Sequence, residues 1–108
     1  MGPKARAAIA DADNEVFVSA ASAWEIAVKR AAGKLDAEVD IPSALERSYF
    51  LELPISVLHA VAAAELPRHH TDPFDRVLIA QARLEDLMLV TDDATIAEYD
   101  VIRLDAGA

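Results

Sequence analysis

Short apolar runs of strand length alternate with longer amphipathic segments along the chain. The run VFVSA is β-branched and aromatic, and LELPI, MLVT and VIRL are similar short runs, so each predicts a strand. Between them, apolar residues recur at the three- and four-residue spacing of a helix that buries one face. The predicted strands cover residues 16–20, 51–55, 88–91 and 101–104, and the predicted helices cover residues 4–12, 23–32, 41–50, 57–65, 73–86 and 93–99.

Local sequence signals support these boundaries and indicate the fold class. Gly33 follows the helix over residues 23–32, and glycine commonly ends a helix. Pro54 lies inside the strand over residues 51–55, which predicts that this strand lies at a sheet edge. Because strands and helices alternate, the strands are expected to be parallel and covered by helices. We therefore expect an α/β fold.

Composition is typical of a single globular domain. With 108 residues, 54% of them apolar, the chain can form a core, and we expect one domain over residues 1–108. The lack of cysteine excludes disulfides, thiolate zinc sites and a cysteine nucleophile. No apolar run reaches the length of a signal-peptide core or a membrane span, so we expect a cytoplasmic protein without membrane contact.

Charge constrains the partners that the chain can attract. The formal net charge of -9 opposes nonspecific attraction to a polyanion such as a nucleic acid. A nucleic-acid substrate would therefore need metal ions or local basic residues to offset the field. A basic protein partner would be attracted to the same surface.

Carboxylates stand near helix starts in three segments. Glu25 follows VFVSA, Asp72 and Asp75 open the helix DPFDRVLIAQA, and Asp92 and Asp93 follow MLVT. If the strands lie parallel in one sheet, these carboxylates meet at one end of it, where open α/β folds place their sites. Carboxylates brought that close repel each other unless a cation neutralises them. An oxygen-only set suits Mg²⁺ or Mn²⁺, and such a metal promotes phosphodiester hydrolysis by activating water.

Each carboxylate also has a structural explanation that the sequence leaves open. Glu25 completes the S-x-x-E pattern of a capping box, and this explanation is as good as the functional one. Asp72, before a proline, is an ordinary N-cap, and Asp75 then lies at N3, where the helix dipole favours an acid. Asp92 or Asp93 can cap the helix that follows. The functional interpretation depends on the three segments taken together.

Three blocks of the sequence resemble a known family. VSAASAWEIAVKRAAGKL, LPRHHTDPFDRVLIAQA and LMLVTDDATIAEYDV resemble segments of PIN-domain toxins of the VapC type, from bacterial and archaeal toxin-antitoxin pairs. The resemblance covers residues 4–104, with the blocks in the family's order and spacing. Glu25, Asp75 and Asp93 match the family's second, third and fourth acidic residues, and Asp93 is preferred to its neighbour because the pattern has the acid two residues after Thr91.

The resemblance implies a PIN-like fold of three layers, with a short parallel sheet flanked by helices. It also implies a metal-dependent endoribonuclease toxin that hydrolyses RNA phosphodiester bonds with Mg²⁺-activated water. Glu25, Asp75 and Asp93 are then the catalytic residues and the ligands of Mg²⁺, for which Mn²⁺ can substitute. The expected partners are the RNA substrate, a cognate antitoxin protein and a second copy of the chain in a homodimer.

The family pattern also contains an apolar strand that ends in a first metal-binding Asp, ahead of the segment matching GPKARAAIADADNEVFVSA. No such strand precedes Val16 in this sequence, and Asp11 and Asp13 lie in a polar turn that does not match the motif. We therefore expect a fold in which the first strand is missing. The alternative function is a catalytically impaired PIN remnant that binds an antitoxin or another copy of itself.

Five further residues are assigned to supporting roles. Asp72, Thr91 and Asp92 are expected either beside the metal ligands or as helix caps. Arg76 and Lys29 are candidate RNA contacts, although a solvated surface charge is the commoner role for each.

Large apolar residues on the helices are assigned mainly to the core. Trp24 could stack on a base, but core packing is the preferred explanation. The helices over residues 43–50 and 57–65 are candidates for a dimer or antitoxin interface, with core packing again preferred for most of their side chains. The side chains concerned are Leu45, Tyr49, Phe50, Leu58 and Val61.

Overall fold

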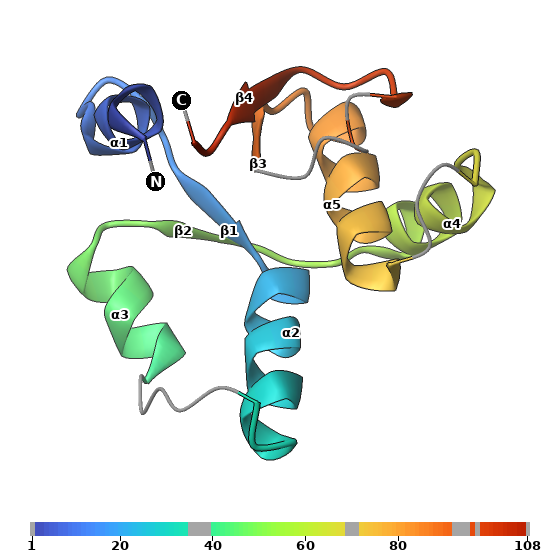
Figure 1. The fold of residues 1–108 in the computed structure, drawn as a ribbon, viewed down its shortest axis with the longest axis horizontal. Helices are drawn as coiled ribbons and strands as arrows, with labels where there is room; N and C mark the ends of the chain where they lie inside the picture. The colour runs from blue at the N-terminus through green and yellow to red at the C-terminus, as the bar shows by residue number, and fades with distance from the viewer. Residues whose placement is uncertain (1, 35–39, 69–71, 92–95, 97, 108) are drawn as a thin grey trace. The chain divides into compact units, whose positions relative to one another are not determined.

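The computed structural model describes residues 2–34, 40–68, 72–91, 96 and 98–107, and Figure 1 shows their helices and strands. The chain forms two compact units, each of which is described by itself. The insert unit is Glu15–Ile55, and the helix-pair unit combines Met1–Asn14 with Ser56–Ala108. The single domain expected over residues 1–108 stays a prediction. Within the described part, no helix is long and apolar enough to cross a membrane.

The insert unit contains β1 (Phe17–Ser19), α2 (Ala20–Ala31), α3 (Ile41–Arg47) and β2 (Leu51–Leu53). β1 and β2 run parallel, with Phe17 opposite Leu51 and Ser19 opposite Leu53. One residue earlier, the carbonyl of Val16 accepts a hydrogen bond from the amide of Leu51 at 2.9 Å. The strands predicted at residues 16–20 and 51–55 are therefore present and paired with each other.

Ser19 is both the last residue of β1 and the N-cap of α2. Its backbone is extended, and its Oγ accepts a hydrogen bond from the amide of Ala21 at 3.0 Å. The helix therefore begins at residue 20 rather than at residue 23. The turn from strand to helix needs no connecting loop.

The helix-pair unit contains α1 (Pro3–Ala10), α4 (Val57–Glu65), α5 (Pro73–Leu84), β3 (Leu89–Thr91) and β4 (Arg103–Asp105). β3 and β4 are parallel, with Thr91 opposite Asp105. The amide of Gly2, the N-cap residue of α1, donates to the carbonyl of Ala106 at 2.7 Å. This bond connects the start of α1 to the end of β4.

The core of the helix-pair unit lies along the contact between α4 and α5, which pack against each other (Figure 1). Ile79 of α5 and Ile96 after β3 are almost completely buried. Such side chains contribute about 1.5 to 3 kcal/mol each when removed from water. The buried cluster consists of Ala63, Leu66, Ile79, Ala80, Ile96 and Tyr99.

A buried histidine connects the start of α4 to the end of α5. The side chains of Ser56 and His59 form a capping box, in which the amide of Ser56 donates to Nδ1 of His59 at 3.0 Å. Since Nδ1 accepts that bond, the ring proton is on Nε2, which lies 2.8 Å from the carboxylate of Glu85. His59 is 3% exposed, and the amide nitrogen of Gln81 lies 3.3 Å from Nδ1.

Within the part of the chain that the structure describes, three helices are followed by a residue in the left-handed backbone region. After α2, Gly33 has a φ of 72°, and the amide of Lys34 donates to the carbonyl of Lys29 at 2.9 Å, as in a Schellman motif. Tyr49 after α3 and Asp86 after α5 occupy the same position, with φ of 58° and 56°. The turns at Tyr49 and Asp86 explain why α3 and α5 end before their predicted limits at residues 50 and 86.

The α/β class and the parallel pairing of strands are confirmed. The described strands form two separate two-stranded sheets rather than the single sheet that we expected. β2 ends at Leu53, directly before Pro54, because proline has no amide hydrogen for a ladder. The helix predicted over residues 93–99 lies mostly outside the described residues.

The substitution His59→Ala should lower the free energy of unfolding by about 2 to 3 kcal/mol. It removes a capping side chain and leaves the amide of Ser56 without its acceptor. Glu85→Gln is the matched control, because it keeps an oxygen for Nε2–H and changes a half-exposed side chain, so we expect a loss below about 1 kcal/mol. Urea unfolding followed by circular dichroism measures both, and equal values for the two variants would contradict this role of His59.

Candidate functional site

Asp75 lies in the first turn of α5, where the start of the helix is tightly capped. Asp72 is the N-cap, and its Oδ1 accepts hydrogen bonds from the amides of Phe74 at 2.8 Å and Asp75 at 3.4 Å. Pro73 fits the first helical position because an amide hydrogen there would have no acceptor within the helix, so proline loses no hydrogen bond. The expected capping role of Asp72 is therefore confirmed. Asp75 is partly buried and follows at N3, where the helix dipole stabilises a negative charge.

Glu25 lies in the second turn of α2 and does not take part in a capping box. The N-cap of this helix is Ser19, so Ser22 is inside the helix and the capping-box explanation of Glu25 is wrong. The carboxylate instead pairs with Lys29 one turn later, with Nζ and Oε2 3.3 Å apart. The Lys29 side chain is 55% exposed, and an exposed pair at this spacing stabilises a helix by only about 0.3 to 0.5 kcal/mol.

Asp92 and Asp93 lie outside the described residues. Thr91 immediately precedes them at the end of β3, and its carbonyl accepts a hydrogen bond from the amide of Ala106 at 2.9 Å. Glu25 and Asp75 belong to different compact units. Among the side chains that the structure does describe, no three His, Asp or Glu residues come close enough together to hold a metal.

The donor atoms of the predicted ligand set nevertheless fit a hard divalent cation. Glu25 and Asp75 offer only carboxylate oxygens, the ligands that Mg²⁺ and Mn²⁺ accept. The Lys29 partner of Glu25 is weakly held, so it can be displaced by a cation. The described residues are therefore compatible in chemistry with a Mg²⁺ site.

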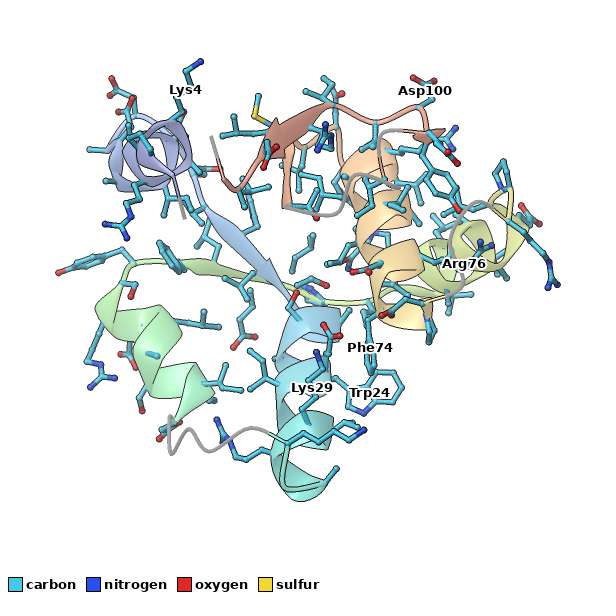
Figure 2. All side chains as sticks on the ribbon, in the orientation of Figure 1. Lys4, Trp24, Lys29, Phe74, Arg76 and Asp100 are labelled. Atoms are coloured by element: carbon cyan, nitrogen blue, oxygen red, sulfur yellow. The ribbon has the colours of Figure 1, made fainter. Side chains whose placement is uncertain are left out.

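Arg76, the neighbour of Asp75, is not simply a solvated charge, because backbone carbonyls at the end of α4 hold its guanidinium, so that expectation is wrong. Its contact with RNA stays a prediction. Figure 2 shows its side chain beside α4. Nη2 donates to the carbonyls of Ala63 at 2.8 Å, Ala64 at 3.4 Å and Leu66 at 2.8 Å, and Nη1 donates to Pro67 at 3.1 Å. The last carbonyls of a helix lack partners within the helix, and a guanidinium satisfies several at once.

Tyr99 is a second residue whose role the sequence did not predict. Its hydroxyl donates to the carbonyl of Pro67 at 2.6 Å, the same oxygen that Arg76 contacts. The side chain of Tyr99 is nearly buried in the core of the helix-pair unit. The sequence carried only a weak signal of these contacts. Leu66 and Pro67 follow α4 directly, and Arg76 follows the DPFD motif.

Apolar side chains assigned to the core prove to be exposed in several places. Trp24 on α2 is 61% exposed, so the core explanation is wrong, and Figure 2 shows Trp24 and Lys29 on the same helix. Of the interface candidates, Tyr49, Leu58 and Val61 are exposed as well. Leu45 and Phe50 are partly buried. The explanation by core packing therefore fails for the three exposed residues.

A hollow of about 540 Å³ lies between α4 and α5. Its walls are mainly apolar, with one acid from α4 and one base from α5. The lining residues are Ala62, Glu65, Leu66, Pro67, Ala80, Arg83 and Leu84.

Comparison with known proteins places the chain in a family. The family model described as PIN domain matches residues 2–102, which is nearly the whole chain. A search of curated proteins and a search of solved structures gave no match. The α/β elements and the parallel strand pairs agree with the family match. The chain therefore belongs to the PIN-domain family.

Proposed function

We propose that this chain is a metal-dependent endoribonuclease and the toxin of a toxin-antitoxin pair. PIN domains are generally nucleases and often depend on Mg²⁺. The observation that carries the proposal is the family match over residues 2–102 together with Asp75 in the first turn of α5. The toxin role, the RNA substrate and the cognate antitoxin are supported by the resemblance of the three sequence blocks to VapC-type toxins.

In this proposal Glu25, Asp75 and Asp93 hold one Mg²⁺ or Mn²⁺ ion. When bound, such an ion lowers the pKa of water and stabilises the charge that develops on the leaving oxygen. Asp75 is held by the capped start of α5, which restricts where its carboxylate can lie. Asp72, Thr91 and Asp92 support this arrangement by capping or by contact with the ligands.

Lys29 has two successive roles in the proposed site. In the described structure it pairs with Glu25, and the weak pair costs little to separate. Once Glu25 binds a cation, the ammonium group of Lys29 is available for an RNA phosphate one helical turn away. A local basic group of this kind is needed because the net charge of -9 repels RNA.

Asp75→Asn should abolish metal-dependent RNA cleavage, with a loss of at least about 100-fold, because changes to the partners of metal ligands alone cost 10- to 100-fold. The measurement is cleavage of a structured RNA in Mg²⁺ or Mn²⁺, beside a sample with EDTA. Asp86→Asn is the matched control, an exposed Asp at the other end of the same helix, and it should cleave like the original chain. Equal activity of Asp75→Asn and the original chain would contradict the proposal.

Lys29→Met should weaken RNA binding without weakening metal binding. If Lys29 contacts one phosphate, the slope of log K against log salt should fall by about 0.7 for a single strand. The affinity for Mn²⁺ should stay constant or rise, since the cation that competes for Glu25 is gone. Fluorescence anisotropy with a labelled RNA at several salt concentrations measures the slope, and Lys4→Met in α1 is the control. An unchanged slope would show that Lys29 does not contact an RNA phosphate.

A second candidate function is self-association through α4, favoured by the apolar face of that helix. Val57 is 80% exposed and Leu58 is 72% exposed, and Val61 lies one turn farther along the same face. Exposed apolar side chains that cluster in this way are typical of interaction sites. In this interpretation the chain is a catalytically impaired PIN protein whose remaining role is to bind a second copy or an antitoxin.

Leu58→Glu combined with Val61→Glu should convert a homodimer into a monomer, because two carboxylates would be buried in an apolar contact. Sedimentation velocity of the purified chain gives the oligomeric state. Val28→Glu is the matched control, since Val28 is a comparably exposed apolar residue on α2. A chain that is already monomeric without the substitutions would exclude self-association by this face.

A further inference from the structure

The carbonyl of Pro67 accepts hydrogen bonds from two residues that are far apart in the sequence. Arg76 Nη1 donates to it at 3.1 Å from the first turn of α5. Tyr99 Oη donates at 2.6 Å from the segment between β3 and β4. A carbonyl oxygen has two lone pairs, so this acceptor is fully used.

Each donor is fixed to its own element. Arg76 directly follows Asp75, and its guanidinium also contacts the carbonyls of Ala63 and Leu66 at 2.8 Å each. Hydrogen bonds from a charged donor are short and roughly twice as strong as neutral ones. A guanidinium held by several carbonyls therefore restricts how the start of α5 moves against the end of α4.

Tyr99 extends this restriction to the sheet of the same unit. Its amide donates to the carbonyl of Ile96 at 3.0 Å, and its carbonyl accepts from Val101 at 2.9 Å. The next residue, Ile102, accepts from the amide of Leu89 in β3 at 2.9 Å. The shared carbonyl thus connects the helix that carries Asp75 with β3, the strand after which Asp93 follows in the sequence.

We propose that the Tyr99 hydroxyl and the Arg76 guanidinium are positioning groups for metal binding at Asp75, acting through the carbonyl of Pro67. This inference rests on the proposed function, because it requires Asp75 to be a metal ligand. In this role the pair acts through Pro67 and does not touch the metal. It fixes the start of α5 relative to β3, and so restricts where the carboxylate of Asp75 can lie when it binds an ion.

The test measures the dissociation constant for Mn²⁺ from the electron paramagnetic resonance signal of the free ion. Tyr99→Phe removes one hydroxyl and should raise that constant about tenfold, as expected for residues that orient metal ligands. Arg76→Lys should raise it by a similar factor, although it keeps the positive charge, because a lysine cannot reproduce the planar set of donors. All titrations are made at a temperature at which circular dichroism shows each variant to be folded.

The chain offers a matched control for each substitution. Tyr49→Phe removes the hydroxyl of the other tyrosine, which is 91% exposed, and Arg83→Lys changes an exposed arginine on the same helix as Arg76. Both controls should bind Mn²⁺ like the original chain. If Tyr99→Phe and Arg76→Lys lower the melting temperature but leave the Mn²⁺ constant unchanged, the two groups are only structural and the inference is wrong.

Asp75→Asn separates a failure of this inference from a failure of the proposed function. If Asp75→Asn loses Mn²⁺ binding while Tyr99→Phe and Arg76→Lys retain it, only the positioning role is overturned. If Asp75→Asn binds Mn²⁺ like the original chain, Asp75 is not a ligand, and both proposals fail. If Tyr99→Phe does not fold, Arg76→Lys decides the question by itself.

Discussion

The helix-pair unit depends on keeping α4 and α5 antiparallel and in one register. The buried cluster between them includes Ala63 and Ala80, whose small side chains give little shape with which to fix the register. Directional hydrogen bonds at the two ends of the α4–α5 pair fix the register that packing leaves open. His59 joins the start of α4 to the end of α5, and Arg76 joins the start of α5 to the end of α4.

This constraint explains how an acidic chain can keep a carboxylate in a defined place. Asp75 is in the first helical turn, between the cap formed by Asp72 and the carbonyl contacts of Arg76. The hydrogen bonds that hold the backbone at the start of α5 come from the side chains of Asp72 and Arg76. The central claim of the proposed function is that this carboxylate and Glu25 share one divalent cation, which also offsets part of the net charge of -9 that repels RNA.

Sequence patterns predicted the local elements better than the contacts between them. Each strand and the cap at Asp72 follow from features within a few residues, and these were predicted correctly. The start of α2 was misplaced because Ser19 and Ser22 are both good caps, and only the end of β1 decides between them. The contacts of Arg76 and the exposure of Trp24 depend on residues distant in the sequence, so helical periodicity could not predict them.

The most direct test of the central claim is to titrate the ¹⁵N-labelled chain with Mn²⁺ and follow the broadening of its amide signals. A paramagnetic ion broadens nearby amides, so one shared ion must affect residues from both compact units. The account predicts that the signals of Glu25 and Asp75 broaden together, at the same low Mn²⁺ concentration. Broadening at only one of the two, or broadening spread over exposed acids such as Asp13 and Glu46, would contradict it.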